Sequence, residues 1–110
     1  MKILFKKVCI GSDHAGFKLK ENIKDFLIDK NISVFDSGPL NENSVDYPDY
    51  ARKVSNRVKS NKSDVGILVC GSGTGMAISA NKIKGIRAAV CYNNKSTRLS
   101  RLHNNANIIS

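Results

Sequence analysis

The stretch Val65-Gly-Ile-Leu-Val-Cys70-Gly-Ser-Gly-Thr-Gly75-Met-Ala-Ile-Ser-Ala-Asn81 decides the fold of this chain. Residues 65–69 are mostly apolar and too few for a helix, so they predict a strand buried on both faces. Glycine then occupies alternate positions, where a missing Cβ lets the backbone turn sharply and lets a bound group approach. A helical pattern resumes at Met76. A strand, a glycine-rich turn and a helix N-terminus together present free backbone N–H groups, which favour an anion.

Three familiar anion-binding loops do not fit this stretch. A Walker phosphate loop ends in Gly-Lys-Ser/Thr, whereas Gly75 is followed by Met76 and Ala77. A dinucleotide-binding loop needs glycine at position 76 and an acidic residue about 20 residues further on, and residues 91–94 contain no carboxylate. A cysteine phosphatase needs an arginine soon after its cysteine, and residues 71–81 contain none. With these three loops excluded, the stretch is best interpreted as a cysteine facing a binding site for a small anion.

Length and charge set further bounds. The chain has 110 residues, of which 41% are hydrophobic, and this suits one domain with an ordinary core. Its 18 Lys and Arg residues exceed its 9 Asp and Glu residues, and the net charge of +9 favours an acidic partner or substrate. The basic residues are scattered through helical patterns with few aromatic residues among them. A solvated basic surface is therefore favoured over nucleic-acid binding.

The cysteines indicate a compartment. Cys9, Cys70 and Cys91 lie in or at the ends of apolar runs and lack the spacing of a metal site, so free thiols in a reducing environment fit best. No secretory signal follows Met1, and no apolar run approaches the roughly 18 residues of a membrane span. We therefore expect a cytoplasmic protein that does not enter a membrane.

Strands and helices alternate along the chain. A strand at 8–11 precedes a helix that Ser12 or Asp13 can cap, and Pro48 suits the first turn of the next helix. The other expected elements are strands at 32–35, 65–69, 86–91 and from 107, and helices over 76–82 and 95–102. Apolar residues at helical spacing form a stripe on the first helix and a buried face on the second. They are Leu19, Ile23, Phe26 and Leu27, and then Tyr50 or Ala51, Val54 and Val58.

This alternation predicts a Rossmann-like three-layer α/β/α sandwich. A five-stranded parallel sheet would have right-handed crossovers, helices on both faces and the flavodoxin-like strand order 2-1-3-4-5. We expect residues 1–110 to form a single domain. In such sheets a ligand binds beyond the carboxyl ends of the strands, where strands 1 and 3 lie side by side. The loops expected there are 12–16 and 70–75, the two most unusual stretches of the chain.

Each candidate residue also has a purely structural interpretation. Asp13 alone suits a helix N-cap, and Asp46 suits a plain turn. Cys70 alone suits a small buried hydrophobe, and His103 suits the surface. His14 is not required by a cap and would project toward the crevice. The functional interpretation therefore depends on the group and not on any single member.

Six motifs occur in order across nearly the whole chain. They are Gly-Ser-Asp-His-Ala-Gly-Phe-Lys-Leu-Lys at 11–20, Asp-Tyr-Pro at 46–48, Cys-Gly-Ser-Gly-Thr-Gly at 70–75, Ala-Asn-Lys at 80–82, Gly-Ile-Arg-Ala at 85–88 and Leu-Ser-Arg-Leu-His-Asn-Asn-Ala-Asn at 99–107. Together they resemble ribose-5-phosphate isomerase type B. That superfamily includes galactose-6-phosphate isomerase subunits, so the resemblance indicates a class of sugar phosphate more firmly than one sugar.

The resemblance implies an activity and a catalytic set. The reaction would interconvert ribose 5-phosphate and ribulose 5-phosphate through a cis-enediolate, in the non-oxidative pentose phosphate pathway. Cys70 would be the base, and Ser72 would assist proton transfer at the sugar oxygens. His103, helped by Asp46, would open the sugar ring by general acid–base catalysis.

The resemblance also implies a substrate-binding set. Asp13 would hold a sugar hydroxyl, and His14 would contact the phosphate. Backbone N–H groups of residues 71–75 would stabilise the enediolate together with Asn104. The full substrate-binding set is Asp13, His14, Tyr47, Gly71, Gly73, Thr74, Gly75 and Asn104. Neither a metal nor another cofactor is implied.

Assembly and length follow from the same resemblance. Family members form homodimers or dimers of dimers with shared sites, so His103 would come from the partner of the chain that supplies Cys70. They usually continue past the last strand into a helix whose arginines bind phosphate, whereas this chain stops at Ser110. Because Arg–phosphate contacts are strong, we expect the 110-residue chain alone to be a poor enzyme, below the usual turnover of about 1–1000 per second.

Two alternatives stay open. In the first alternative, the chain is an isomerase of a six-carbon aldose phosphate, and comparing rates on five- and six-carbon sugars would reveal this. In the second alternative, the chain is a non-catalytic module that binds a phosphorylated ligand at the same loop. A module has no need of a thiol, so Cys70→Ala would then leave ligand affinity intact.

Overall fold

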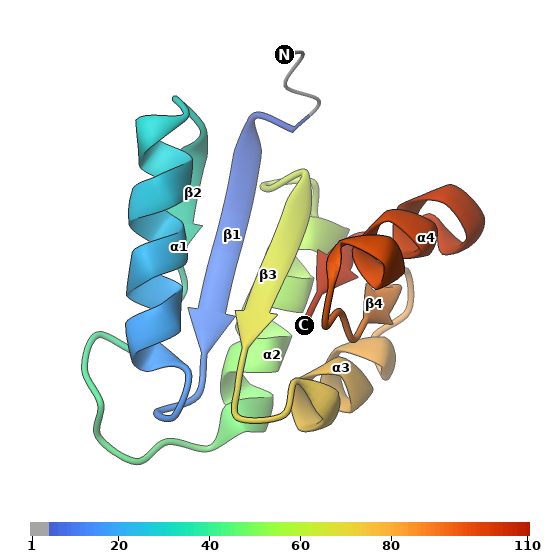
Figure 1. Cartoon of the computed structure of the whole chain (residues 1–110). Coiled ribbons are helices and arrows are strands. Elements are labelled where there is room, and N and C mark those ends of the chain that lie inside the picture. The colour runs from blue at the N-terminus through green and yellow to red at the C-terminus, as the bar shows by residue number, and fades with distance from the viewer. Residues whose placement is uncertain (1–4) are drawn as a thin grey trace.

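Five parallel strands form a central sheet in this computed structural model, which describes residues 5–110 (Figure 1). The strands are β1 (Lys7–Ser12), β2 (Ser33–Asp36), β3 (Val65–Val69), β4 (Ala88–Ala89) and β5 (Ile108–Ile109). The helices are α1 (Phe17–Asp29), α2 (Tyr47–Lys59), α3 (Thr74–Asn81) and α4 (Asn94–Asn104). The predicted α/β sandwich with a five-stranded parallel sheet is confirmed.

The order of the last two strands differs from the predicted 2-1-3-4-5. The observed order is β2-β1-β3-β5-β4, because Gly66 and Ile67 of β3 pair with Ile108 and Ile109 of β5. An inner strand of a parallel sheet is covered on both faces and pairs on both sides, which suits two isoleucines. The small, half-buried Ala88 and Ala89 of β4 take the edge. The strand predicted over 86–91 is accordingly reduced to two residues.

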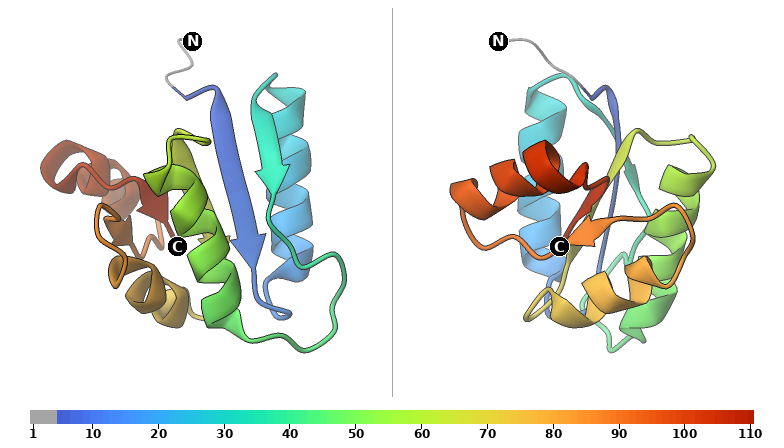
Figure 2. Two further views of the ribbon diagram at one scale, coloured as in Figure 1. Left: turned by 180° about the vertical axis from the view of Figure 1, so that it is seen from behind. Right: turned by 90° about the vertical axis from the view of Figure 1, so that its right-hand side faces the viewer.

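The helices divide between the two faces of the sheet. Figure 2 shows α1 and α4 on one face and α2 and α3 on the other. Right-handed crossovers dictate this division, because the chain moves outward from β1 to β2, crosses back to β3 and β4, and then reverses into β5. Each reversal of direction along the sheet changes the face on which the connecting helix lies.

The hydrophobic core lies mainly between the sheet and the α2/α3 face. Ala51 and Val54 of α2 are fully buried and Val58 is nearly so, which confirms the predicted buried face of this helix. The remaining core residues come from the strands, from α3 and from the turn after it; they are Cys9, Leu68, Ile108, Met76, Ala80 and Ile86.

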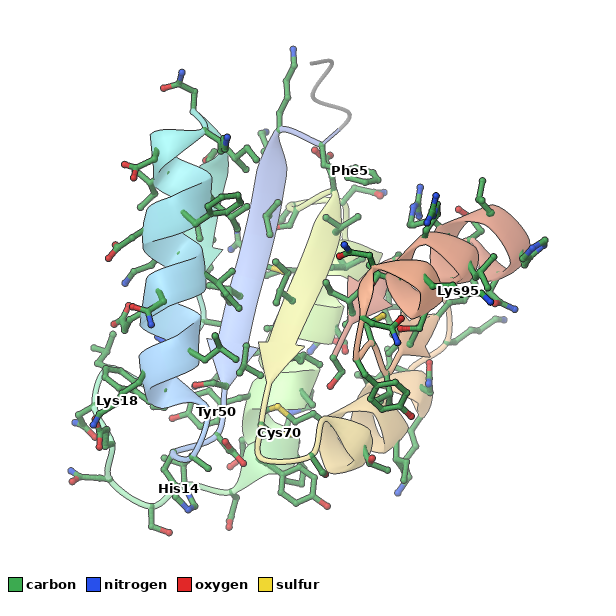
Figure 3. The ribbon with its side chains drawn as sticks, in the orientation of Figure 1. Phe5, His14, Lys18, Tyr50, Cys70 and Lys95 are labelled. Atoms are coloured by element: carbon green, nitrogen blue, oxygen red, sulfur yellow. The ribbon has the colours of Figure 1, made fainter. Side chains whose placement is uncertain are left out.

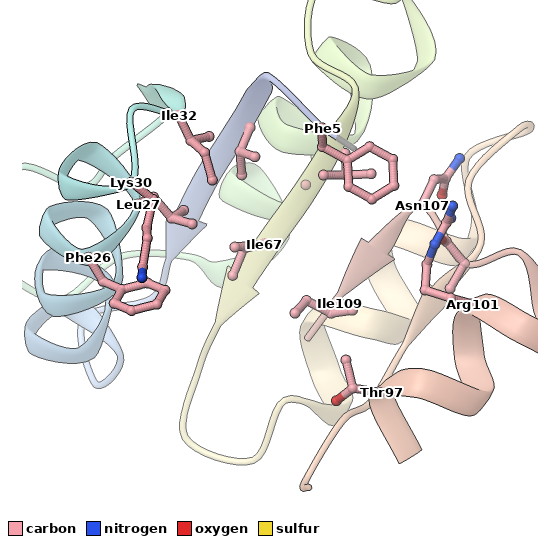
Figure 4. A pocket seen from close by; sticks show the side chains of 14 residues that line it. Phe5, Phe26, Leu27, Lys30, Ile32, Ile67, Thr97, Arg101, Asn107 and Ile109 are labelled. Atoms are coloured by element: carbon pink, nitrogen blue, oxygen red, sulfur yellow. The ribbon is translucent and has the colours of Figure 1, made fainter. Parts of the chain in front are cut away.

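The α1/α4 face is covered far less completely. The predicted apolar stripe of α1 is present, but Leu19 and Phe26 are 55% and 60% exposed. Between α1 and α4 an apolar groove of about 390 Å³ opens over β1, β3 and β5. Figure 4 shows Phe26 on one side of this groove, Ile67 and Ile109 at its floor, and Phe5 at its end.

Three helices begin at other residues than the sequence pattern predicts. Helix α3 begins at Thr74, two residues before the predicted Met76, with Gly73 as its N-cap. Helix α1 begins at Phe17 with Gly16 as its N-cap, because Ser12 is still part of β1 and Asp13 belongs to a turn before the helix. Helix α4 begins at Asn94, where a capping box joins Asn93 and Ser96. The Asn93 side chain accepts a hydrogen bond from the Ser96 N–H at 2.8 Å, which satisfies a donor that the helix itself leaves free.

Candidate active site

Two loops come together at the carboxyl edge of the sheet, at the ends of the neighbouring strands β1 and β3. The Asp13 N–H donates to the Val69 carbonyl at 3.1 Å, so the turn after β1 lies directly against the end of β3. Gly16 is packed so closely on Val69 that any Cβ there would collide with its backbone. This places loop 12–16 beside loop 70–75, as the fold prediction expected.

The glycine-rich loop turns its backbone toward the Cys70 sulfur. Gly73 has a φ of +80°, a left-handed conformation that side chains rarely adopt, and its N–H donates to Cys70 Sγ at 2.9 Å. A donor aimed at sulfur stabilises negative charge there. Ser110 Oγ donates to the Gly73 carbonyl at 2.6 Å and fixes the same residue from the other side.

The same loop holds unused donors. Within residues 5–110, the Gly71 and Ser72 N–H groups donate to no other atom, while the Thr74 N–H donates to Ser72 Oγ at 3.3 Å. The first turn of α3 contributes further amides without helical partners, including that of Gly75. Half-buried Cys70 therefore sits beside a cluster of N–H groups at a helix N-terminus, an arrangement that stabilises a developing oxyanion.

A cavity of about 400 Å³ opens in front of Cys70. Its wall includes the residues that follow β4, namely Cys91, Tyr92, Asn93 and Asn94, as well as Ser110 after β5. None of these residues is among those predicted for the site from the sequence. The rule that ligands bind beyond the carboxyl ends of parallel strands applies to every strand and would have found 91–94.

His14 lies on the neighbouring loop, at the same end of the sheet as Cys70 (Figure 3). Its Nδ1 accepts a hydrogen bond from the Val45 N–H at 3.3 Å, so it is adjacent to the segment that leads into α2. The next residue, Asp46, is the N-cap of α2, but its side chain makes no capping hydrogen bond. The Asp46 carboxylate is exposed and remains available to a ligand.

Tyr47 and Asp13 complete the group that the fold brings together. The Tyr47 ring packs on Gly75, where an added Cβ would lie 3.0 Å from it, and the residue is 42% exposed. Asp13 Oδ1 accepts the Gly16 N–H at 2.7 Å, whereas its Oδ2 accepts no hydrogen bond from residues 5–110. One carboxylate oxygen thus shapes the turn, and the other is available to a ligand.

Two predicted residues are not brought to Cys70 within one chain. The cavity in front of Cys70 contains Asn94 and Thr97 from the first turn of α4. His103 lies six residues beyond Thr97, about 9 Å further along the helix axis at 1.5 Å per residue. Asn104 lines a different cavity, together with Asn81 and Arg87. Both residues are exposed on the surface.

The remaining cysteines and the possible metal ligands are the last candidate groups. Burial raises the pKa of Cys9, and this effect outweighs the lowering of the pKa by the hydrogen bond with Ser63 and by the charge of Arg57. The thiol therefore stays protonated in the core. Cys91 is half-buried and free. The described residues bring together no group of three or more His, Cys, Asp or Glu side chains for a metal ion. Among them, no helix is long and apolar enough to cross a membrane.

Comparison with known proteins identifies the family of this chain. Residues 8–110 match the family model described as Ribose/Galactose Isomerase. The chain belongs to this family of sugar isomerases, and the predicted resemblance is confirmed.

Individual relatives bear specific names. Ribose-5-phosphate isomerase B of Escherichia coli (strain K12) is 44% identical over 105 residues, which cover 96% of this chain and 70% of that protein. The structure of ribose 5-phosphate isomerase B from Thermotoga maritima matches with a TM-score of 0.93 and 55% identity, over 94% of this chain and 71% of the other. Ribose-5-phosphate isomerase B from Mycoplasma genitalium, solved with bound ribulose-5-phosphate, matches with a TM-score of 0.89 and 43% identity over 94% and 69%.

Proposed function

We propose that this protein interconverts ribose 5-phosphate and ribulose 5-phosphate. The observation that carries the proposal is the Cys70 thiol at the end of β3, which receives the Gly73 N–H and lies beside the unused N–H groups of Gly71 and Ser72. Relatives that bear the name of this activity match along nearly the whole chain. We further propose that the protein acts in the cytoplasm, where its free thiols persist.

The reaction moves one proton between adjacent carbons. The Cys70 thiolate takes the proton from C2 of the open-chain aldose, and the C–H electron pair forms the C1=C2 bond while the aldehyde oxygen becomes an oxyanion. The proton of the C2 hydroxyl passes to this oxyanion, so the charge moves to O2. The Cys70 thiol then returns its proton to C1, and C2 becomes the ketone.

The loop after β3 stabilises the intermediate. The backbone N–H groups of residues 71–75 would bind the enediolate oxygens, and preorganised donors of this kind require no rearrangement during the reaction. Ser72, whose hydroxyl lies at the loop surface, would relay the proton between O1 and O2. Asn104 of a second subunit would add a side-chain donor.

The other candidate residues bind the sugar and open its ring. Asp13 would accept a hydroxyl through its unused oxygen, and His14 would contact the phosphate. Tyr47 and Thr74, at the starts of α2 and α3, would contact the sugar from the α2/α3 side. Ring opening needs a general acid and base, for which we propose His103 with the exposed Asp46 as helper.

Assembly completes the proposed site. Because α4 carries His103 and Asn104 away from the Cys70 cavity of their own chain, we propose a homodimer or a dimer of dimers in which a partner supplies both residues. Such shared sites are a common consequence of isologous contacts, since each subunit gives and receives the same residues.

The first experiment tests the base. Ribose 5-phosphate is incubated with the protein in D₂O, and NMR follows both ribulose 5-phosphate and deuterium at its C1. Cys70→Ala should lose both signals, because no base remains, while its folding by circular dichroism and its affinity for ribose 5-phosphate stay unchanged. Cys91→Ala, a half-buried free thiol of the same cavity, is the matched control and should keep them.

The outcomes separate the candidate functions. Equal activity in Cys70→Ala would exclude Cys70 as the base. The family description also includes galactose, so a six-carbon aldose phosphate is the second candidate substrate. A higher kcat/KM on the six-carbon sugar would favour it. Tight binding without deuterium uptake on either sugar would indicate a binding module.

A further inference from the structure

Helix α1 buries a lysine where an apolar residue is expected. Lys20 is 0% exposed and is the only buried residue of this helix, although its neighbour Leu19 and Phe26 further along the helix are more than half exposed. Its Nζ lies 2.7 Å and 2.9 Å from the two carboxylate oxygens of Asp36, at the end of β2. The same ammonium lies 5.0 Å from the centre of the Phe17 ring.

This ion pair continues into the backbone of the active-site edge. Asp36 Oδ1 accepts the Gly38 N–H at 2.8 Å, and the Gly38 carbonyl accepts the Ser12 N–H at 3.1 Å. A second link joins the Ser37 N–H to the Ile10 carbonyl at 2.8 Å. The chain of contacts from α1 thus ends at Ser12, the residue directly before Asp13.

Stability alone does not account for such a pair. Removing two charges from water is unfavourable, and apolar residues of similar volume often replace buried ion pairs without loss of stability. The two charge-assisted hydrogen bonds from one ammonium do, however, hold both oxygens of Asp36 at once and so restrict rotation of the carboxylate. Lys20 is the only buried side chain of α1, so little apolar packing besides this pair holds the helix against the sheet.

We propose that Lys20 and Asp36 are positioning residues for the active site: their buried ion pair fixes the 37–38 turn against Ser12 and so holds Asp13 where it meets the sugar. Neither side chain touches the substrate. The expected change in KM rests on the proposed function. The expected protection of the Ser12 and Gly38 amides against hydrogen exchange does not depend on any activity.

The test compares two lysines that bind one carboxylate. Lys24 lies one turn further along α1, is 26% exposed, and reaches Asp36 Oδ2 at 3.0 Å. Lys20→Met removes the buried partner, and Lys24→Met is the matched control. We expect KM for ribose 5-phosphate to rise about tenfold in Lys20→Met, the effect of one lost charged hydrogen bond, with a smaller change in kcat. Lys24→Met should change KM less than about twofold, because Lys24 is partly open to solvent, which weakens its pair with Asp36.

A second pair of variants keeps or removes the acceptor for Gly38. Asp36→Asn loses the ion pair but retains an oxygen for the Gly38 N–H, whereas Asp36→Ala loses both. Both variants remove the carboxylate that pairs with Lys20, so their difference isolates the link to the turn. We expect KM to be lower in Asp36→Asn than in Asp36→Ala. Equal KM values would contradict a link through Gly38.

Hydrogen exchange separates this proposal from the proposed function. On ¹⁵N-labelled protein, the Ser12 and Gly38 amides should exchange at least about tenfold faster in Lys20→Met than in Lys24→Met. This holds even if the wild type turns over no sugar phosphate. If Lys20→Met fails to fold, Asp36→Ala, which lacks both the ion pair and the acceptor for Gly38, takes its place in the same measurement. Unchanged exchange, or a lowered melting temperature with an unchanged KM, overturns the proposal and leaves the pair a purely structural role.

Discussion

The Asp36 carboxylate combines burial with charge in a single side chain. Burial by itself would raise the pKa of Asp36, but hydrogen bonds from Lys20, the Gly38 N–H and Lys24 together lower the pKa below its usual value. A carboxylate whose pKa is lower in the folded state than in the unfolded chain stabilises the fold above the unfolded pKa, about 3.9, and loses this contribution as the pH falls through the folded pKa.

This sign gives a pH-dependent prediction. The free energy of unfolding of the wild type and of Asp36→Asn is measured by urea denaturation between pH 7 and pH 2. We expect the wild type to be the more stable above about pH 5, and the difference to shrink steadily below about pH 4. A difference that stays constant over this range would mean that ionisation of Asp36 does not contribute to stability.

Single residues differ in how far the sequence predicts them. Cys70 and the glycine loop follow from local signals, because a buried strand, alternating glycines and a helical pattern lie next to one another. The Lys20–Asp36 pair has no such signal: its members are 16 residues apart, and a lysine is expected at the surface. Only the pairing of β2 with β1 brings them together.

Among the elements, α2 approaches the sheet over two glycines. A Cβ on Gly66 of β3 would lie 2.6 Å from Val54, and one on Gly11 of β1 would lie 2.8 Å from the same side chain. Val54 is fully buried and stiff at χ1, so it has no room to move aside. The missing side chains therefore set the distance between this helix and the sheet.

Gly66→Ala should lower the free energy of unfolding by about 1–3 kcal/mol, because overpacking forces the helix and strand apart. Urea denaturation measures the loss. Gly71→Ala, where no atom lies within 4 Å of the added Cβ, is the control and should be nearly neutral.

Combining Gly66→Ala with Val54→Ala gives a second measurement on the same contact. The double variant should be more stable than the sum of the two single effects predicts, since the added methyl fills space that the smaller residue vacates. Strict additivity would mean that Gly66 and Val54 do not limit the approach of α2.

The sequence predicts elements well where the pattern is strong and poorly where it is short. The buried face of α2 follows from apolar residues at helical spacing together with Pro48 in the first turn. The order of β4 and β5 does not follow, because two-residue strands carry no periodicity, and their positions are set by pairing with β3. The start of α1 at Phe17 does not follow either, because Asp13 forms a turn with Gly16 before the helix begins.

For the whole molecule, the separation of Cys70 from His103 has a consequence in mixtures of variants. Cys70→Ala and His103→Ala should each be inactive alone. Mixed and allowed to exchange subunits, they form heterodimers in which one of two sites has both wild-type residues. Random pairing then restores about a quarter of the wild-type activity if sites are shared across an isologous interface.

The assay is ribulose 5-phosphate formation before and after mixing, with light scattering to follow the dimer. Mixing Cys70→Ala with Ser72→Ala is the control and should restore nothing, because both residues lie on one loop of one chain. A monomeric mass, or no recovery in the first mixture, would contradict a site made by two subunits.

The open groove between α1 and α4 also bears on how stability varies with temperature. Unfolding raises the heat capacity because apolar surface becomes hydrated, by about 12–15 cal/mol/K per residue in ordinary domains. Around Phe26, Ile67 and Ile109 part of that surface is already open to solvent in the native chain. As long as nothing covers the groove, the heat-capacity change should fall below the ordinary value. The curve of stability against temperature would then be flatter than that of a fully covered sandwich of the same length.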